Sequence, residues 1–449
     1  MSFEWKRMKI GDLCDQFGAE LQTGPFGSQL HSYDYKETGI PVVPTEAIDD
    51  GKINPDVLPR ISSEKANELS RHLLRQDDIL FARRGAQATG KTAIVRKSDE
   101  GAICGTGAIR LRIEKAKSIA FPSFLATYLS GKETICWIRH HAIGATMPNL
   151  NEGIIRSIPI LLPSLQEQKA IVHILGTLDD KIELNSKINE TLEAMAKALF
   201  KSWFVDFDPV RAKVEGRSTG LPAEISDLFP DSFEDSELGE IPRGWSVAPV
   251  GEVVECVGGS TPSTSEPAYW DGGKYFWVTP KDLSSLPEPF LLDTAKKITA
   301  DGVQRISSGI LPVGTILLSS RAPVGYIAAA CVPVSINQGF IALKGNALMP
   351  STYLLNWCLS NVQQFKDRAS GTTFAEISKA AFRPIPLLAP SDQVARIFSE
   401  KAQILYDRVV SNMKQSNLLS ASRDTLLPKL ISGELRIPDA EKILEKVGV

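Results

Sequence analysis

The sequence lacks several features that would each define a class of protein. No run approaches the ~20 consecutive apolar residues of a membrane-spanning helix, and the first residues, MSFEWKRMKIGDLCDQ, hold no apolar stretch typical of a signal peptide. The six cysteines form no C-x-x-C pair, so we expect reduced thiols in a cytoplasmic protein that makes no membrane contact. The five histidines show no H-E-x-x-H or zinc-finger spacing, so no bound metal is expected.

A basic excess, which often marks a nucleic-acid-binding protein, is also missing, since the net charge is −3. The charges are nevertheless sorted along the chain. Residues 79–112 contain seven Lys and Arg against only Asp99 and Glu100, whereas residues 231–240 (DSFEDSELGE) contain five acidic residues and no basic one. An ordinary solvated surface explains either run alone, but the sorting leaves room for a polyanionic partner.

The sequence does contain an internal duplication with a long period. WKRMKIGDL from Trp5 resembles WSVAPVGEV from Trp245, 240 residues later. Further matches follow in the same order: ILFARRG with ILLSSRA, GATMPNL with GTTFAEI, and IPILLPSLQEQ with IPLLAPSDQ. The period is too long for a solenoid, so we expect two related domains, each followed by a related segment.

The segment after the first copy predicts a long helix. Its apolar residues step by 4, 3 and 4, the spacing of a coiled-coil seam, over Ile171, Leu175, Leu178 and Ile182, and again over Ile188, Leu192, Met195 and Leu199. No proline interrupts residues 164–208, and a helix of about 40 residues would be roughly 60 Å long. The same rhythm places Asn185 on the seam, where it is either a buried residue that fixes the register or an exposed residue of a surface helix.

The second copy repeats this arrangement more loosely. Its apolar positions are Ile397, Ile404, Leu405, Val409, Met413 and Leu419. They precede LLPKLISGEL, in which Pro428 and Gly433 are stop signals. Two long amphipathic helices in one chain most simply bury their seams against each other, and the whole domain between them leaves an antiparallel pairing free.

The duplicated domains themselves predict a mixed α/β (α+β) fold with irregular, mainly β cores. Short β-branched bursts such as TAIVRK, AIRLRI, GTILLSS and GFIALKG are separated by turn residues, and helical stretches near 121–142 and 350–369 close the two domains. The acidic, proline-containing stretch 207–243 is expected to be a connection with little regular structure.

Residues 85–92 spell G-x-x-x-x-G-K-T, the pattern of a phosphate-binding loop. Such a loop lies between a strand and a helix, whose N-terminus binds the phosphate. The residues after Lys91 show no helical period, and the second copy has Tyr326 in place of the lysine and is two residues shorter. Both copies instead predict a hairpin of two apolar strands with a basic loop, in which Arg84 corresponds to Arg321.

A basic hairpin loop suits DNA, because arginine can fork onto guanine O6 and N7 or onto a phosphate. The sequence contains no methyltransferase N/D-P-P-Y/F motif and no glycine-rich S-adenosylmethionine loop. Asp179, Asp180 and Lys181 form the D-x-K part of a nuclease motif, but no Pro-Asp partner is nearby, so we interpret them as a solvated helix face. No catalytic residue is therefore expected in this chain.

Nearly the whole chain resembles the specificity (S) subunits of type I restriction–modification enzymes. The most specific stretches are residues 158–210, residues 426–437 (LLPKLISGELRI) and residues 258–283 (GGSTPSTSEPAYWDGGKYFWVTPKDL). The resemblance implies two target-recognition domains, each reading one half of a split, asymmetric DNA site. It also implies two long antiparallel coiled-coil helices that hold the domains a fixed distance apart, and a subunit that performs no chemistry.

The expected parts of the chain follow from this resemblance. They are recognition domains at 1–163 and 244–390, long helices at 164–206 and 391–432, a connection at 207–243 and a tail at 433–449. The implied partners are double-stranded DNA, two methyltransferase (modification) subunits and restriction (translocase) subunits. This chain is expected to bind no cofactor, whereas its partners are expected to use S-adenosylmethionine, and ATP with Mg²⁺ for restriction.

The candidate DNA-binding residues are basic side chains near the repeated motifs. They are Arg83, Arg84, Lys91, Arg139, His140 and His141 in the first domain, and Lys281, Arg305, Arg321, Lys379 and Arg383 in the second. For each one alone, an ordinary surface charge is an equal alternative. Trp203, Phe204 and Phe207 end the first long helix and either anchor a methyltransferase subunit or pack on the helix pair. Two other functions stay open: a phosphate-loop NTPase, and a coiled-coil scaffold that binds only protein.

Overall fold

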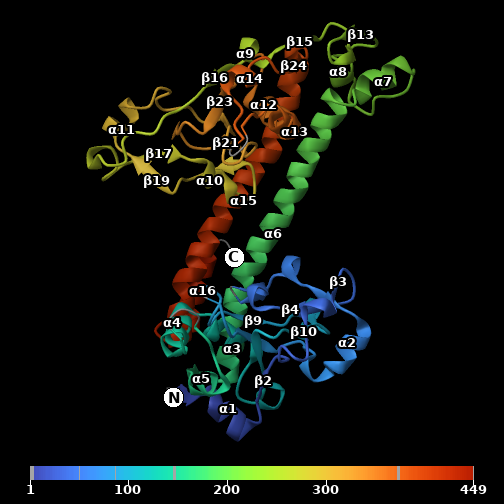
Figure 1. Cartoon of the computed structure of the whole chain (residues 1–449). Coiled ribbons are helices and arrows are strands. Elements are labelled where there is room, and N and C mark those ends of the chain that lie inside the picture. The colour runs from blue at the N-terminus through green and yellow to red at the C-terminus, as the bar shows by residue number, and fades with distance from the viewer. Residues whose placement is uncertain (1–4, 50, 86, 145–147, 372–374, 448–449) are drawn as a thin grey trace. The chain divides into compact units, whose positions relative to one another are not determined.

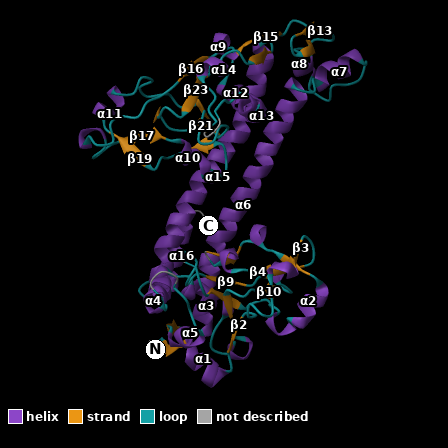
Figure 2. Cartoon of the chain, in the orientation of Figure 1, coloured by secondary structure: helices purple, strands orange, loops and turns teal. Residues whose placement is uncertain are grey.

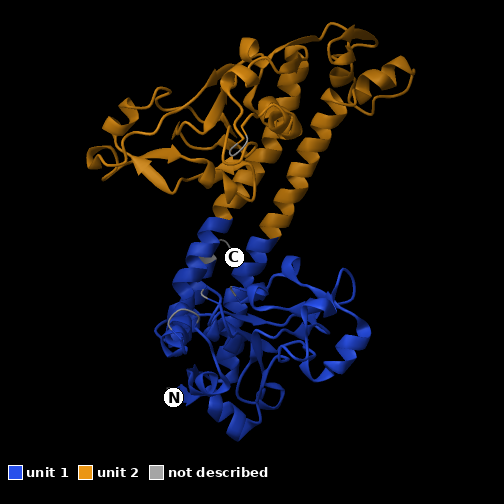
Figure 3. Ribbon diagram, viewed as in Figure 1, with its two compact units in different colours: residues 1–183, 416–449 blue, residues 184–415 orange. Residues whose placement is uncertain are grey.

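The computed structural model describes residues 5–49, 51–85, 87–144, 148–371 and 375–447 (Figure 1). The chain divides into two compact units: unit 1 is residues 1–183 with 416–449, and unit 2 is residues 184–415 (Figure 3). Each unit contains one β-rich domain and a part of each of two long helices. Within the described ranges, no helix is both long and apolar enough to cross a bilayer.

A four-stranded antiparallel sheet forms the centre of unit 1. Its strands, in spatial order, are β2 (Glu20–Thr23), β11 (Ala108–Arg112), β8 (Ile79–Ala82) and β9 (Thr92–Ile94). The side chains of β8 alternate between two apolar clusters, with Phe81 on the side of the helices and Leu80 on the side of a smaller sheet. A strand covered on both faces explains why this part of the sequence is a continuous apolar run.

The smaller sheet of unit 1 has the order β10-β4-β7-β3, with β10 and β4 parallel and the other neighbours antiparallel. Its strands are β10 (Ile103–Cys104), β4 (Ile40–Val43), β7 (Arg60–Ile61) and β3 (Tyr35–Lys36). Two further pairs are β1 (Lys6–Lys9) with β12 (Pro159–Leu162), and β5 (Ile48–Asp49) with β6 (Lys52–Ile53). The helices are α1 (Ile10–Phe17), α2 (Ser63–Glu68), α3 (Pro122–Leu129), α4 (Lys132–His141), α5 (Glu152–Ser157) and α16 (Ile437–Val447).

Unit 2 repeats this topology. Its larger sheet has the order β16-β23-β20-β21 with β18 added at the edge, and its smaller sheet has the order β22-β17-β19, again with one parallel pair. The strands are β16 (Glu255–Val257), β23 (Phe340–Lys344), β20 (Ile316–Ser319), β21 (Ile327–Ala330), β18 (Phe290–Leu291), β22 (Val334–Ile336), β17 (Tyr275–Val278) and β19 (Lys296–Ile298). β15 (Ser246–Pro249) pairs with β24 (Pro386–Ala389) as β1 pairs with β12. The duplication predicted from the sequence is confirmed.

The second β-rich domain contains six further helices within the described residues, two of them in the helical stretch that the sequence predicts. They are α9 (Val250–Val253), α10 (Pro280–Ser284), α11 (Ala300–Gln304), α12 (Ser351–Ser360), α13 (Val362–Asp367) and α14 (Lys379–Phe382). α12 and α13 occupy the stretch 350–369, as α3 and α4 occupy 121–142 in the first copy.

Two helices of about 40 residues dominate the chain: α6 (Leu165–Phe204) and α15 (Asp392–Ser432) (Figure 2). α6 begins with a capping box, in which the Ser164 and Glu167 side chains accept hydrogen bonds from each other's backbone N–H. In unit 2, Phe200 packs on Phe398 and Asn189 bonds Asn412, so higher numbers on α6 meet lower numbers on α15. The two helices are therefore antiparallel, as predicted.

The predicted seam is confirmed in unit 1 and partly wrong in unit 2. Ile171, Leu175 and Leu178 are buried with residues of α15 in one cluster. In unit 2, Met195 is 52% exposed and Ile404 is 70% exposed, although the 4-3 spacing places both on the seam. In unit 2 the second domain also packs on these helices, so the heptad count alone does not decide which positions are buried.

Polar side chains form part of the helix interface in unit 2. Asn185 is buried and donates hydrogen bonds to the carbonyl O of Asn412 (3.4 Å) and to Oε1 of Gln415 (3.0 Å). Asn412 donates to Asn189 (2.9 Å), which donates to the buried carboxylate of Glu288 (2.8 Å). The buried alternative for Asn185 is thus the correct one, and this chain of bonds extends from the helix pair into the second domain.

Two local expectations are wrong. Pro428 does not end α15, which continues to Ser432 and stops before Gly433, a glycine in the left-handed conformation (φ 78°). A proline removes one backbone N–H but leaves the helix intact here, because Leu430 and Ile431 of the next turn are buried. The connection 207–243 contains regular structure, namely α7 (Asp208–Val214), α8 (Ala223–Ser226) and the hairpin β13 (Phe233–Ser236)–β14 (Gly239–Pro242).

Candidate nucleic-acid interface

The segment that spells a phosphate-binding loop is a β-hairpin. β8 and β9 pair antiparallel on either side of it, and Lys91 is followed at once by β9, not by a helix. The Lys91 ammonium lies 2.6 Å from Oδ1 of Asp49. A helix N-terminus, which supplies the phosphate-binding donors in a true phosphate loop, is therefore missing at this position. The hairpin prediction is confirmed.

Three loops of unit 1 meet at the hairpin and form what we name the first loop cluster (residues 83–85, 105–107 and 148–150). The N–H of Arg83 donates to the carbonyl O of Gly107 (2.8 Å), and the N–H of Leu150 donates to the carbonyl O of Arg83 (2.8 Å). A β-bridge joins Arg84 to Asn149. Gly107 packs closely on Thr45, since an added Cβ would lie 1.9 Å from Thr45 Oγ1.

The second loop cluster (residues 320–322, 337–339 and 375–377) has the same backbone contacts in unit 2. The N–H of Ser320 donates to the carbonyl O of Gly339 (2.8 Å), and the N–H of Ile377 donates to the carbonyl O of Ser320 (2.9 Å). A β-bridge joins Arg321 to Glu376. These contacts make Arg321 the structural counterpart of Arg84, as the sequence predicts. Of the repeated motifs GATMPNL and GTTFAEI, residues 145–147 and 372–374 lie outside the described residues.

The two arginines of the first cluster are held differently. Nε of Arg83 donates to Oδ1 of Asn149 (3.1 Å) and to the carbonyl O of Leu150 (3.1 Å), so this half-buried side chain braces the loops. Arg84 is exposed, and its Nη2 makes one contact, 3.3 Å to Oγ1 of Thr106. Arg84 is therefore the arginine of this cluster that is best placed to bind an external anion.

Three candidates of the second domain surround the second cluster. Lys281 follows Pro280, whose ring packs on Gly339. Lys379 begins α14, two residues after Ile377. Arg305 is exposed, and its carbonyl O accepts a hydrogen bond from the hydroxyl of Ser260 (3.1 Å), whose N–H donates to the carbonyl O of Ile336 (3.2 Å) next to the cluster. The structure thus gathers these cations around one part of unit 2.

The remaining candidates contact backbone carbonyls of the protein itself. Nε and Nη2 of Arg139 donate to carbonyls of the hairpin loop (Thr89 O, 3.2 Å; Gln87 O, 3.0 Å), and Nη2 of Arg383 donates to the carbonyl O of Cys256 (3.0 Å). The exposed imidazoles of His140 and His141 each place Nδ1 2.8 Å from the carbonyl one turn earlier on α4. Arg139 and Arg383 therefore hold loops in place.

Sequence reasoning missed the residues that lie beside the arginines in these clusters. Thr106 and Gln338 occupy equivalent positions, before β11 and before β23, and Gln338 accepts a hydrogen bond from the hydroxyl of Thr261. Asn149 and Glu376 are also equivalent. Aligning CGTGAIRL with INQGFIAL would have found the first pair, but nothing in the sequence indicates which loops meet the arginines.

The two most deeply buried cysteines of the β-strands are not activated as nucleophiles. Burial raises the pKa of the Cys104 thiol to about 12 and that of Cys256 to about 11, so both are protonated at neutral pH. All six cysteines are free thiols. Within the described part of the chain, no three His, Cys, Asp or Glu side chains are grouped so that they could hold a metal ion.

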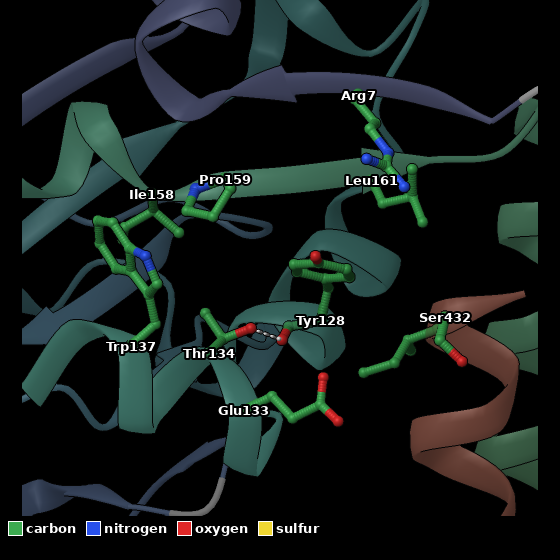
Figure 4. Close-up of a pocket in the computed structure, with 10 residues that line it drawn as sticks. Arg7, Tyr128, Glu133, Thr134, Trp137, Ile158, Pro159, Leu161 and Ser432 are labelled. Carbon is green, nitrogen blue, oxygen red and sulfur yellow. Dashed lines mark hydrogen bonds between the residues drawn. The ribbon is translucent and has the colours of Figure 1, made fainter. Parts of the chain in front are cut away.

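A cavity of about 400 Å³ in unit 1 is lined by none of the candidate DNA-binding residues (Figure 4). Its lining residues are Arg7, Tyr128, Glu133, Thr134, Trp137, Ile158, Pro159, Leu161, Ile431 and Ser432. The hydroxyl of Thr134 donates to the carbonyl O of Tyr128 (3.0 Å). With Glu133 as the one carboxylate among these lining residues, the cavity offers no pair of carboxylates for acid–base work.

The aromatic residues at the end of α6 are buried in unit 2. Trp203 is 1% exposed and stacks edge-to-face on Phe229 (5.0 Å between ring centres). Phe204 packs edge-to-face on Phe398 (5.1 Å), and Phe207 on Trp245 (6.0 Å). This burial favours the packing alternative for the trio over direct contact with a partner.

The fold and the two clusters define a twin-domain protein that presents the same basic loop arrangement twice and holds no catalytic group there. The family model for the type I restriction modification DNA specificity domain matches residues 3–194 and 242–405. The chain belongs to this family, and it is a DNA specificity subunit of a type I restriction–modification system, the non-catalytic subunit of such a complex.

Individual relatives cover the chain to different extents. The HindI specificity subunit of Haemophilus influenzae is 29% identical over 374 residues, which is 72% of this chain and 79% of the relative. The MjaVIII specificity subunit of Methanocaldococcus jannaschii is 22% identical over 97% of this chain and 93% of the relative. The crystal structure of a type I S subunit from M. genitalium superposes with a TM-score of 0.58 at 16% identity, covering 96% of both chains, and so shares the fold.

Proposed function

We propose that each loop cluster is the DNA-reading edge of its domain, so that each recognition domain reads one half of a split, asymmetric site. The observation that carries this proposal is that the two clusters share one backbone arrangement but present different side chains on it. The same backbone hydrogen bonds recur in both units, yet Arg83 is replaced by Ser320 and Thr106 by Gln338. Arginine and amide side chains on such a frame can contact base edges and phosphates.

Methylation mapping tests this proposal directly. A host free of other methylation would express the full chain with its modification subunits, and the methylated bases would be mapped across the genome. We expect one split motif, with Arg84→Gln altering one half and Arg321→Gln altering the other. Neither half changing, or both substitutions changing the same half, would contradict the assignment.

The helix pair is the proposed spacer between the half-sites. Two linked readers gain effective concentration on one DNA only when their spacer matches the site, and a rigid helix pair does this better than a flexible linker. Inserting seven residues into both α6 and α15 adds about 10 Å, or about three base pairs, to the spacer. We expect a longer unread gap with both half-sites unchanged; altered half-sites would refute the spacer role.

The proposed partners are double-stranded DNA, two methyltransferase subunits that dock on the helix pair, and restriction subunits that join them. Those partners would use S-adenosylmethionine, and ATP with Mg²⁺ for restriction. Because the complex would act on DNA inside the cell, its proposed location is the cytoplasm. Trp203, Phe204 and Phe207 would assist docking indirectly, by shaping the end of α6 beside the exposed side chains of Val205 and Val214.

The alternative of a protein-binding scaffold makes a different prediction. Such a scaffold, with its partners present, would not be retained on DNA even at low salt. The proposed function predicts retention that falls steeply as salt rises, because phosphate contacts release counterions.

A further inference from the structure

The two loop clusters differ in the residue that lies opposite the arginine that both copies share. In each cluster one antiparallel β-bridge joins the arginine to a loop residue: Arg84 to Asn149 in the first, and Arg321 to Glu376 in the second. The backbone is the same, but the side chain is an amide in one cluster and a carboxylate in the other.

This difference changes the electrostatic state of the two arginines. Nη1 of Arg321 lies 3.8 Å from Oε2 of Glu376, and the two side chains are 36% and 46% exposed. Arg84 contacts the hydroxyl of Thr106 and, among the residues that the structure describes, pairs with no carboxylate. The first cluster therefore presents an uncompensated guanidinium, whereas the second presents one that already has an anionic partner.

We propose that Glu376 is a specificity-determining residue that holds Arg321 back from phosphates, so that the second domain contributes less to non-specific DNA binding than the first. This inference rests on the proposed function, in which the loop clusters face DNA. Arg321 then engages DNA only in exchange for Glu376, while Arg84 engages any phosphate within reach.

The relative strengths of the Arg321 contacts with Glu376, phosphate and guanine support this role of Glu376, which we call the filter. A solvent-exposed ion pair changes an equilibrium by at most about fivefold, which is enough to offset much of a single exposed phosphate contact. A bidentate contact from arginine to guanine O6 and N7 discriminates by about five- to 150-fold. When Arg321 leaves Glu376 to bind a guanine, the free energy of the exchange is therefore favourable. When it leaves Glu376 to bind a phosphate, the free energy of the exchange is close to zero. The carboxylate also repels phosphates directly.

Other cations near the second cluster do not remove the difference. Lys379 and Lys281 lie around this cluster, and among the ion pairs of the described residues none joins either lysine to Glu376, so they attract DNA in every variant alike. A comparison between variants at position 376 isolates the Arg321 contact from their contribution.

The test measures non-specific DNA affinity against salt. The full chain, in complex with its co-expressed modification subunits, is titrated onto a fluorescent 40-base-pair duplex that lacks the methylated motif. We expect Glu376→Gln to tighten binding by two- to fivefold and to steepen the slope of log K against log salt by about 0.9, the value of one added phosphate contact. Adding Arg321→Gln to Glu376→Gln should remove this gain.

The first cluster supplies the converse variant. Asn149→Asp keeps the oxygen that accepts from Arg83 and places a carboxylate opposite Arg84. We expect it to weaken non-specific binding by two- to fivefold, as Arg84→Gln does, and Arg321→Gln alone should weaken it less than Arg84→Gln. Methylation mapping of the Glu376→Gln complex should show relaxed sequence in the second half-site only.

The outcomes separate the two ideas. If Arg84→Gln and Asn149→Asp flatten the salt slope but Glu376→Gln leaves it unchanged, the filter is refuted and the DNA-reading role of the clusters stands. If none of these variants alters the slope, the clusters do not face DNA and both proposals fail. Because Asn149→Asp tests the same effect in the other unit, the inference stays falsifiable even if one variant folds poorly.

Discussion

Glu193 on α6 carries a carboxylate in an environment that disfavours its charge. Its side chain lines a cavity of about 400 Å³ in unit 2, together with Lys197, Glu288 and Tyr406. Burial, and then the neighbouring carboxylates of Glu288 and Glu190, raise the pKa of Glu193 from 4.5 to about 7. The contact between α6 and the second domain should therefore depend on pH.

The sign follows from proton binding. Between pH 4.5 and 7 the folded chain holds a proton on Glu193 that the unfolded chain has lost, so stability falls as pH rises through this window and stays lower above it. A tenfold change in proton affinity corresponds to about 1.4 kcal/mol, which sets an upper limit of about 3 kcal/mol for this group. Because the side chain keeps some contact with solvent, we expect about 1–2 kcal/mol.

Glu193→Gln removes the charge and keeps the shape of the side chain. Amide hydrogen exchange, corrected for intrinsic rates, would be followed for peptides that cover residues 184–204 of α6. At pH 8 we expect the variant to be more protected than the natural chain by about 1–2 kcal/mol, or about five- to 30-fold in the opening equilibrium. At pH 5 the two proteins should exchange alike.

Glu400→Gln is the matched control, because this carboxylate is exposed on α15 and pairs only loosely with Arg396 (3.8 Å). It should change protection by less than about 0.5 kcal/mol at either pH. If Glu193→Gln and the natural chain are equally protected at pH 8, or if the variant is less protected, then the charged form of Glu193 does not destabilise this contact and the reasoning is refuted.

Three further substitutions, the first with a matched control, test other parts of the structure. Trp203→Ala empties a site among Phe229 and Phe398 and should destabilise unit 2 by about 3–5 kcal/mol in urea titration, whereas the neighbouring, exposed Val205→Ala should change it by less than about 0.5 kcal/mol. Asn412→Leu removes the amide that donates to Oδ1 of Asn189 inside the helix interface and should cost about 1–3 kcal/mol by the same assay; a neutral result would show that the polar seam is solvated. Lys91→Ala should leave calorimetric titration with ATP unchanged and cost at most about 1 kcal/mol, because it removes only the ion pair with Asp49.

The topology was predictable because the two copies have matching residues at equivalent points of the fold. Trp5 and Trp245 open the domains, and Arg84 and Arg321 follow equivalent strands, so two weak patterns reinforce each other. The seam of unit 1 was predictable for the same reason, since its apolar residues keep one period. In unit 2 the buried positions include Asn189 and exclude Met195, because packing against the second domain selects which face is covered.

The composition of the loop clusters was not predictable. Arg84 meets Thr106 and Asn149, residues 22 and 65 positions away, and only the folded sheets bring these loops together. A single sequence likewise gave no reason for α7 and α8 in the connection, whose structure depends on a cluster that includes Phe229 and Trp245. Local patterns predict the elements, whereas contacts over long separations decide which side chains share a surface.

The separation of α6 and α15 along the chain has a consequence for biosynthesis. α6 is complete at Phe204, but its partner begins only at Asp392, so residues 205–391 must be made in between. At about 5–20 residues per second, α6 waits roughly 10–40 s on the ribosome before it can pair. During that time Asn185 and Asn189 expose polar amides. Leucines at these two positions would instead expose apolar surface to nearby nascent chains. These two amides therefore make the unpaired face of α6 less apolar until the second helix has been made.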